Sequence, residues 1–123
     1  MKAFKIFNRN MFGSDTEEEY ACNLNKAYQI FNNKVRNTID KLSGNIIDKD
    51  DFREQVSGFK DSFLFKQGNF EIISRKYPYI LYKDKDKEIY IANIYGWYKT
   101  SYEYEEYDIE TLSVVMKEIA IQE

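Results

Sequence analysis

The stretch EIYIANIYGWY, residues 88–98, decides how the sheet of this protein is predicted. It is rich in β-branched and aromatic side chains, which fit a pleated and half-buried surface. The stretches NFEIISRK at 69–76 and YPYILYK at 77–83 have the same character, and the polar run DKDKE at 84–88 is typical of a hairpin loop. We therefore expect three or four antiparallel strands, the fourth being SYEYEEY at 101–107.

Upstream of these strands, the spacing of apolar residues predicts a long helix. The segment SDTEEEY at 14–20 contains two pairs at capping-box spacing, and its glutamates suit the positive end of a helix dipole. Apolar residues then recur at steps of three or four until Ser43, Gly44 and Asn45 end the pattern. The expected helix has about 28 residues and a length of roughly 42 Å. Its apolar stripe consists of Tyr20, Leu24, Tyr28, Phe31, Val35, Ile39 and Leu42.

Two further helices and a short strand complete the expected fold. A second helix begins at Asp48 and ends at Gly68, and residues 3–7 fit a short strand, with a helical lead as the alternative. A C-terminal helix is expected to begin at Asp108, with one apolar face formed by Ile109, Leu112, Val115, Met116 and Ile119.

The order of these elements predicts a single α+β domain over residues 1–123. It has a long N-terminal helix, a second helix, a three- to four-stranded antiparallel sheet and a C-terminal helix. A helix of about 28 residues is longer than a small globule usually needs. Part of its apolar stripe is therefore free to meet another chain, and a homodimer through this helix is one expectation.

The chain contains no histidine and a single cysteine, Cys22. These counts exclude Ser/His and Cys/His catalytic machinery, a histidine-ligated metal, an intramolecular disulfide and a cysteine cluster for zinc. Cys22 lies in the predicted long helix, where we expect a small buried thiol rather than a nucleophile. The acidic segments lack the calcium-loop pattern, and no glycine opens a nucleotide-binding motif. We expect no enzymatic activity, no catalytic residue, no metal and no cofactor.

Neither a membrane span nor a secretion signal is expected. Apolar runs are only a few residues long, far below the ~20 residues that span a bilayer. The N-terminal residues 1–13, MKAFKIFNRNMFG, mix basic with apolar side chains and lack an apolar block before a cleavage site. The sequence indicates a cytoplasmic protein without membrane partners.

Charge is distributed unevenly along the chain. Residues 1–100 carry 17 basic and 14 acidic side chains, a balance of +3, whereas residues 101–123 carry one lysine and seven acids, a balance of −6. Within the acidic part, carboxylates at every second position recur about every 7 Å along an extended backbone. That spacing is comparable with the charges along one strand of a nucleic acid. Such a surface fits a basic groove that normally holds nucleic acid.

Aromatic side chains are interleaved with these acids, and Tyr and Trp are enriched among the residues that dominate interface energies. We therefore predict a partner-binding surface on this segment. Its residues are Trp97, Tyr98, Tyr102, Glu103, Tyr104, Glu105, Glu106 and Tyr107.

Two other interpretations of the aromatic residues stay open. A half-exposed strand with tyrosines toward the core and glutamates toward solvent shows the same pattern without binding anything. A basic sheet with exposed rings would instead stack on nucleic acid, although its interleaved acids and the net charge of −3 disfavour this. The residues of that basic sheet are Arg75, Lys76, Lys83, Lys85, Lys87 and Lys99 among Tyr77, Tyr79, Tyr82, Tyr90 and Tyr95.

The chain is rich in Ile, Lys, Asn, Tyr and Phe and poor in Gly, Ala, Arg and Pro, as expected of an AT-rich genome. In composition it resembles the small inhibitors that phages and mobile elements use against bacterial defence nucleases. The leading hypothesis is a non-enzymatic inhibitor of anti-CRISPR or anti-restriction type that binds a larger nucleic-acid-handling enzyme through its acidic, aromatic surface. One alternative is a toxin-neutralising immunity or regulatory protein. The other is a nucleic-acid-binding protein that uses the Tyr/Lys-rich sheet.

Overall fold

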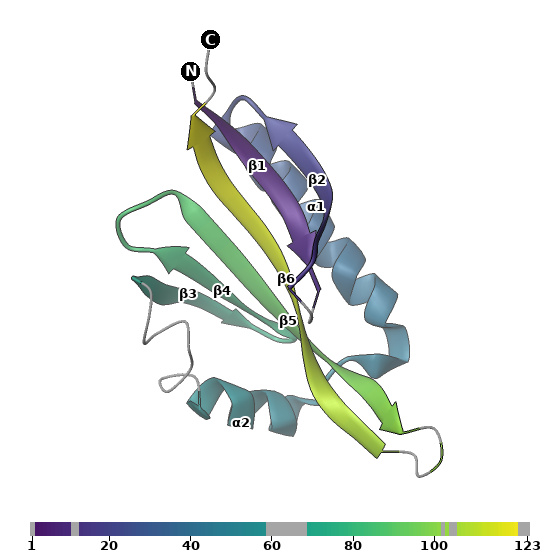
Figure 1. Ribbon diagram of the computed structural model, residues 1–123. Helices are drawn as coiled ribbons and strands as arrows, with labels where there is room; N and C mark the ends of the chain where they lie inside the picture. Colours follow the sequence, from purple (N-terminus) through teal and green to yellow (C-terminus); the bar gives the residue numbers. More distant parts are fainter. Residues whose placement is uncertain (1, 11–12, 59–68, 102, 104–105, 121–123) are drawn as a thin grey trace.

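The computed structural model describes residues 2–10, 13–58, 69–101, 103 and 106–120. Six antiparallel strands form one sheet in the order β2-β1-β6-β5-β4-β3, and helices α1 and α2 accompany it (Figure 1). The elements are β1 (Lys2–Arg9), β2 (Asp15–Ala21), α1 (Leu24–Leu42), the 3-10 turn η1 (Ser43–Asn45), α2 (Lys49–Gly58), β3 (Phe70–Lys76), β4 (Tyr79–Asp84), β5 (Ile89–Ser101) and β6 (Glu106–Ala120).

The predicted fold, with a three- to four-stranded sheet and a C-terminal helix, is wrong. Three of its strands do form, as β3, β4 and β5, and residues 3–7 lie in β1. Of the fourth predicted strand, 101–107, Ser101 belongs to β5, Glu106 and Tyr107 belong to β6, and residues 102, 104 and 105 lie outside the described residues. The second helix agrees with α2 up to Gly58, and the rest of its predicted range lies outside the described residues.

The first part of the predicted long helix is strand β2, which lies at one edge of the sheet. Its glutamates suit a helix start by their spacing, but charged side chains also suit an edge strand, because they discourage pairing with other chains. Lys34 of α1 fastens this edge to the helix. Its ammonium donates to the Glu17 carbonyl and lies 3.0 Å from a Glu19 carboxylate oxygen.

Helix α1 therefore begins at Leu24 and has 19 residues. It starts where the side-chain oxygen of Asn23 accepts a hydrogen bond of 2.8 Å from the amide of Lys26, which satisfies one of the free amides of the first turn. Cys22 lies just before this cap and is exposed, so the prediction of a buried thiol is wrong. The argument for a homodimer from a helix of about 28 residues also fails.

Residues 106–120, predicted as helix from Asp108 onward, form strand β6, which pairs with β1 on one side and β5 on the other. Val114, Val115 and Met116 are all buried, so both faces of β6 are covered. A strand covered on both faces loses the apolar–polar alternation, and its apolar residues then also fit a helical spacing. Asp108 does not cap a helix, because its carboxylate accepts a hydrogen bond from the amide of Ile109 in the strand.

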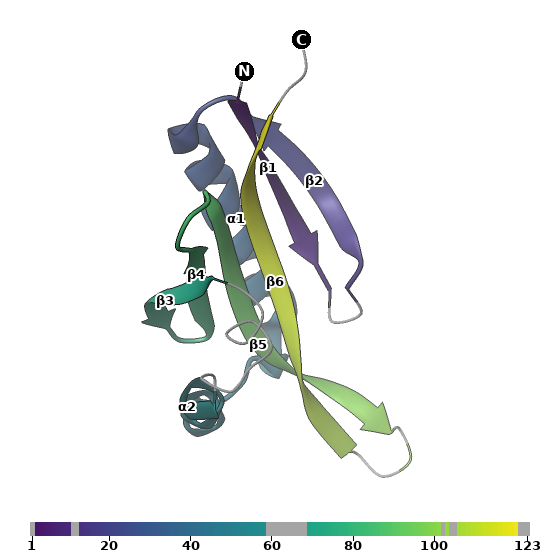
Figure 2. The same cartoon turned by 60° about the vertical axis from the view of Figure 1, so that its left-hand side comes forward.

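Helix α1 packs on one face of the sheet, across β1, β6 and β5 (Figures 1 and 2). Ala27 and Ala92 have no exposed surface, and their small size lets the helix approach the strands closely. At the edge of this layer the Tyr28 hydroxyl donates to the Tyr90 hydroxyl at 2.8 Å. The buried cluster between helix and sheet contains Ile6, Ala21, Ala27, Phe31, Val35, Leu42, Tyr90, Ala92, Ile94, Val114 and Met116.

The chain passes from this layer to the opposite face of the sheet at Gly96. There Ile46 forms an isolated antiparallel bridge with Gly96, and the amide of Ile47 donates to the Tyr95 carbonyl at 3.2 Å. Helix α2 follows on the other face, where Phe52 meets the Tyr95 ring edge-on with 5.9 Å between centroids. Ile47, Phe52, Ile80, Tyr82 and Tyr95 form this second buried cluster.

Gly96 is required at this crossing because a side chain has no room there. A Cβ on Gly96 would lie 2.8 Å from Leu42 Cδ2 and 2.9 Å from the Asn45 carbonyl oxygen. Gly44 lies between Leu42 and Asn45 in the chain, yet a Cβ on Gly44 would meet no atom within 4 Å. The two glycines of this region therefore differ sharply in what they tolerate.

Among the residues that the structure describes, neither helix combines the length and the hydropathy needed to cross a bilayer.

We predict that Gly96→Ala lowers the free energy of unfolding by about 1–3 kcal/mol, the usual cost of forcing extra atoms into a filled site. Gly44→Ala is the matched control and should change it by less than about 0.5 kcal/mol. Urea denaturation followed by circular dichroism measures both variants. Equal stability of the two variants would contradict the close approach at Gly96.

Candidate functional site

The predicted binding segment lies on a two-stranded ribbon that projects from the sheet. Toward the C-terminal end of β5, its pairing with β4 stops at Ile94. Toward the N-terminal end of β6, its pairing with β1 stops at Ser113. Beyond both, β5 and β6 continue to pair with each other through residues 95–101 and 106–111, and Gly96 also forms the bridge with Ile46. Figures 1 and 2 both show this part, hereafter the ribbon, extending away from the rest of the molecule.

The base of the ribbon is fixed by both helical layers. Trp97 and Ile109 lie opposite each other in the register, and both pack against the buried cluster on the α2 side. Gly96 lies against Leu42 at the end of α1. The ribbon is therefore held at its base by packing on two sides, while Tyr107 further along is 54% exposed.

Five of the eight predicted binding residues belong to the described part of the ribbon and its turn. Trp97 and Tyr98 are partly buried, whereas Glu103, Glu106 and Tyr107 are exposed. The other three predicted residues, Tyr102, Tyr104 and Glu105, lie outside the described residues.

Trp97 and Tyr107 lie on the same face of the ribbon and line one surface recess. The register pairs Trp97 with Ile109 and Lys99 with Tyr107, so the two rings are diagonal neighbours across the strands. The recess has a volume of about 390 Å³, and Gly44 and Asn45 of η1 form its remaining described lining. The indole and the phenol give it two aromatic walls.

Gly44 and Asn45 were not predicted to belong to a site. They are more than fifty residues away from Trp97 in the chain, and their only sequence signal is the end of a helical pattern. The bridge between Ile46 and Gly96 brings them to the ribbon. Their position beside Trp97 results from the topology of the fold, so the local spacing of residues in the sequence does not predict it.

The opposite face of the ribbon is acidic. Asp108 pairs with Tyr98, and Glu110 pairs with Gly96. Asp108 is exposed, while Glu110 is partly buried, and this burial raises the pKa of the Glu110 carboxyl above its usual value. With the exposed Glu103 and Glu106, the ribbon presents carboxylates beside aromatic rings.

Three of the five tyrosines of the predicted basic sheet are placed differently. Tyr82, Tyr90 and Tyr95 are 0%, 8% and 3% exposed, and burial raises the pKa of all three hydroxyls. Rings buried in this way are not available for stacking on nucleic-acid bases. Lys83, one of the predicted basic residues, lies over the Tyr90 ring and 4.0 Å from a Glu88 carboxylate oxygen.

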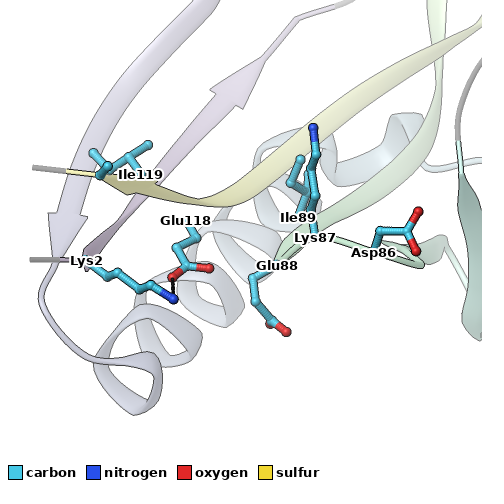
Figure 3. Close-up of a pocket in the computed structure, with 8 residues that line it drawn as sticks. Lys2, Asp86, Lys87, Glu88, Ile89, Glu118 and Ile119 are labelled. Carbon is cyan, nitrogen blue, oxygen red and sulfur yellow. Dashed lines mark ion pairs between the residues drawn. The ribbon is translucent and has the colours of Figure 1, made fainter.

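A second recess, of about 370 Å³, lies between the β4–β5 hairpin and the ends of β1 and β6 (Figure 3). Its side chains carry both signs of charge. Lys2 forms an ion pair of 3.2 Å with Glu118, and the amide of Glu118 donates to the Glu88 carbonyl. Because its acids and lysines alternate, this recess offers no surface of one sign to a ligand. Its lining consists of Lys2, Asp86, Lys87, Glu88, Ile89, Glu118, Ile119 and Ala120.

Within the described ranges, no three His, Cys, Asp or Glu side chains come together as they would to hold a metal ion. Comparison of the chain with protein families, curated proteins and solved structures found no match. The ribbon is therefore the candidate site on geometry and charge alone.

We predict that Glu110→Gln raises the stability of the folded protein at pH 7 by a small amount. A carboxyl with a raised pKa in the folded state favours its neutral form, so folding is disfavoured as pH rises above the pKa of the unfolded chain, about 4.3. Below about pH 4 the carboxyl is protonated in both the folded and the unfolded state, so the variant and the parent should have the same free energy of unfolding.

Thermal unfolding at pH 3.5 and pH 7 measures this difference, with Glu106→Gln as the exposed control that should change little at either pH. A Glu110→Gln variant that is less stable than the parent at pH 7 would show that neighbouring groups stabilise the ionised Glu110, contrary to the prediction.

Proposed function

We propose that this protein is a non-enzymatic inhibitor that docks its ribbon on a larger protein partner, a nucleic-acid-handling enzyme. The observation that carries the proposal is the position of an acidic and aromatic surface on a ribbon that projects beyond the sheet. A projecting two-stranded element can enter a groove that a flat sheet face cannot reach. The absence of histidine from the sequence supports a role in binding rather than in acid–base catalysis.

Charge supports the choice of partner. Residues 101–123 carry one lysine and seven acidic side chains. The side chains of Glu103, Glu106 and Asp108 are exposed to solvent. A groove that binds nucleic acid is lined by basic residues, and complementary charge speeds association with it and disfavours wrong partners. The ribbon would then occupy the groove in place of the nucleic acid.

The composition of the chain is typical of an AT-rich genome, and it is the basis for proposing that such an inhibitor belongs to a phage or mobile element of a low-GC bacterium. In this proposal it acts in the bacterial cytoplasm against a defence enzyme, in the manner of anti-CRISPR or anti-restriction proteins. No cofactor takes part in this function.

One observation favours a second candidate, a toxin-neutralising immunity or regulatory protein. The recess walled by Trp97 and Tyr107 suits a contact that depends on aromatic burial rather than on charge mimicry. The two candidates differ in salt dependence, because the Debye length falls from about 10 Å at 0.1 M salt to about 3 Å at 1 M. A contact dominated by charge weakens across that range, whereas an aromatic contact changes little.

We predict that the double variant Glu103→Lys/Glu106→Lys remains folded but retains about tenfold less of the partner protein than the parent does. Both side chains are exposed, so the reversal changes the surface potential of the ribbon without disturbing the core. The measurement is capture from nuclease-treated lysate of a low-GC bacterium, quantified by mass spectrometry, with and without competing DNA.

The matched control is Asp40→Lys/Glu71→Lys, which makes the same change in net charge at exposed sites on α1 and β3. The proposal requires one protein that is retained by the parent and by this control, released by DNA and lost with the ribbon variant. If both double variants lost the partner equally, the loss would be an effect of net charge alone, and a role for the ribbon would be contradicted.

A further inference from the structure

We propose that β2 is a detachable cover strand at the edge of the sheet, held closed by ion pairs rather than by apolar packing (Figure 2). Six of its seven residues are exposed, and Ala21 at its end is the only buried one. A strand that buries so little apolar surface has few of the contacts that resist local opening. The inference is independent of the proposed function, because no residue of β2 belongs to the ribbon.

All four carboxylates of β2 form ion pairs, two with β1 and two with α1. The pairs are Asp15–Arg9 (2.8 Å) and Glu18–Lys5 (3.1 Å) on the β1 side, and Glu17–Lys41 (3.1 Å) and Glu19–Lys34 (3.0 Å) on the α1 side. Charge therefore holds β2 to both of its neighbours. Ion pairs between exposed side chains weaken as salt rises, so this attachment depends on ionic strength.

The space between β2 and α1 is a polar recess of about 300 Å³. Ile30 is the one apolar side chain among its described lining residues, and the others are charged, amide or hydroxyl side chains. The side chain of Lys34 is only 7% exposed, and its ammonium contacts the Glu17 carbonyl and the Glu19 carboxylate, both on β2. A buried ammonium needs such partners, so Lys34 fastens the closed strand and regains water when β2 opens.

The backbone pairing of β2 with β1 is also weaker than that of β1 with β6. The register of β2 against β1 shifts between Ile6 and Asn8, and Glu17 has a φ of 53°. A left-handed conformation is unfavourable for a residue with a Cβ, and opening of β2 relieves it. In contrast, β1 pairs with β6 through each of its eight residues without a shift. The strand that separates first is therefore β2.

Opening of β2 uncovers the edge of β1, a strand with apolar side chains. Ile6 and Phe7 of β1 are 0% and 1% exposed. The unpaired backbone donors and acceptors of such an edge are a template for an added strand, whereas an edge strand with charged side chains discourages pairing. The attachment of β2 thus determines whether this edge of the sheet repels or accepts another strand.

Amide hydrogen exchange of the purified protein at 0.05 M and 1 M NaCl tests the proposal. We predict that the amides of β2 exchange about three- to tenfold faster at 1 M NaCl, because salt screens the exposed ion pairs. The amides of β4 and β5 should change by less than about 1.5-fold, because opening of β2 leaves their pairing intact.

Two double variants separate the ion pairs of β2 from net charge. Arg9→Gln/Lys41→Gln removes one pair on each side of β2, and both cations are exposed, so the protein should remain folded. Exchange in β2 at 0.05 M NaCl should rise by about threefold, and its response to salt should fall by about half. The matched control, Lys2→Gln/Arg53→Gln, makes the same charge change by breaking two exposed ion pairs outside β2. It should exchange in β2 as the parent does.

The inference is overturned if salt leaves the exchange of β2 unchanged, or if β2, β4 and β5 accelerate equally, because the opening would then be global. It is also overturned if the two double variants change β2 exchange equally, because net charge alone would then explain the effect. None of these outcomes involves a partner protein, so they are distinct from a failure of the ribbon to bind.

Discussion

The antiparallel pairing of β5 with β6 is the constraint on which the rest of the structure depends. It joins the half of the sheet that contains β1 and β2 to the half that contains β3 and β4. It also separates the two buried layers, because neighbouring residues of a strand point to opposite faces. Ile94 enters the cluster under α1, and the next residue, Tyr95, enters the cluster under α2.

The same pairing creates the ribbon, because β5 and β6 extend beyond the residues that pair with β4 and β1. Where β4 and the helices cover β5, its tyrosines become part of the core, as Tyr90 and Tyr95 do. Where that cover ends, the aromatic residues reach the surface, and Tyr107 of the facing strand is half-exposed. One residue type thus has two roles, and the length of the neighbouring strands determines which role each tyrosine takes.

The parts of the fold that the sequence predicted are those in which local pattern and tertiary burial agree. The strands β3 to β5 combine β-forming residues with polar hairpin segments, and the second half of the predicted long helix has one apolar stripe that α1 does bury. The helices wrongly predicted at 14–20 and from Asp108 onward lie where local and tertiary preferences conflict. The glutamates of 17–19 satisfy helix-start rules but lie on an edge strand, and 114–116 are buried on both faces of β6.

The candidate site was predicted only in part for a related reason. Trp97 and Tyr107 are visible in the sequence because aromatic residues stand out among acids. Gly44 and Asn45 join them through the passage of the chain from one face of the sheet to the other, which no local pattern encodes. The acidic balance of the C-terminal segment was readable from the sequence, whereas its projection from the sheet depends on where β1 and β4 stop.

The passage of the chain at Gly96 has a thermodynamic consequence for recognition. The backbone at the base of the ribbon is bridged to Ile46 and packed against Leu42, so its conformational entropy has already been lost when the protein folds. A partner that contacts Trp97 therefore meets a pre-organised surface, and less ordering opposes association than a free loop would impose. If the ribbon binds a partner as proposed, the stability of the core contributes to the affinity of that contact.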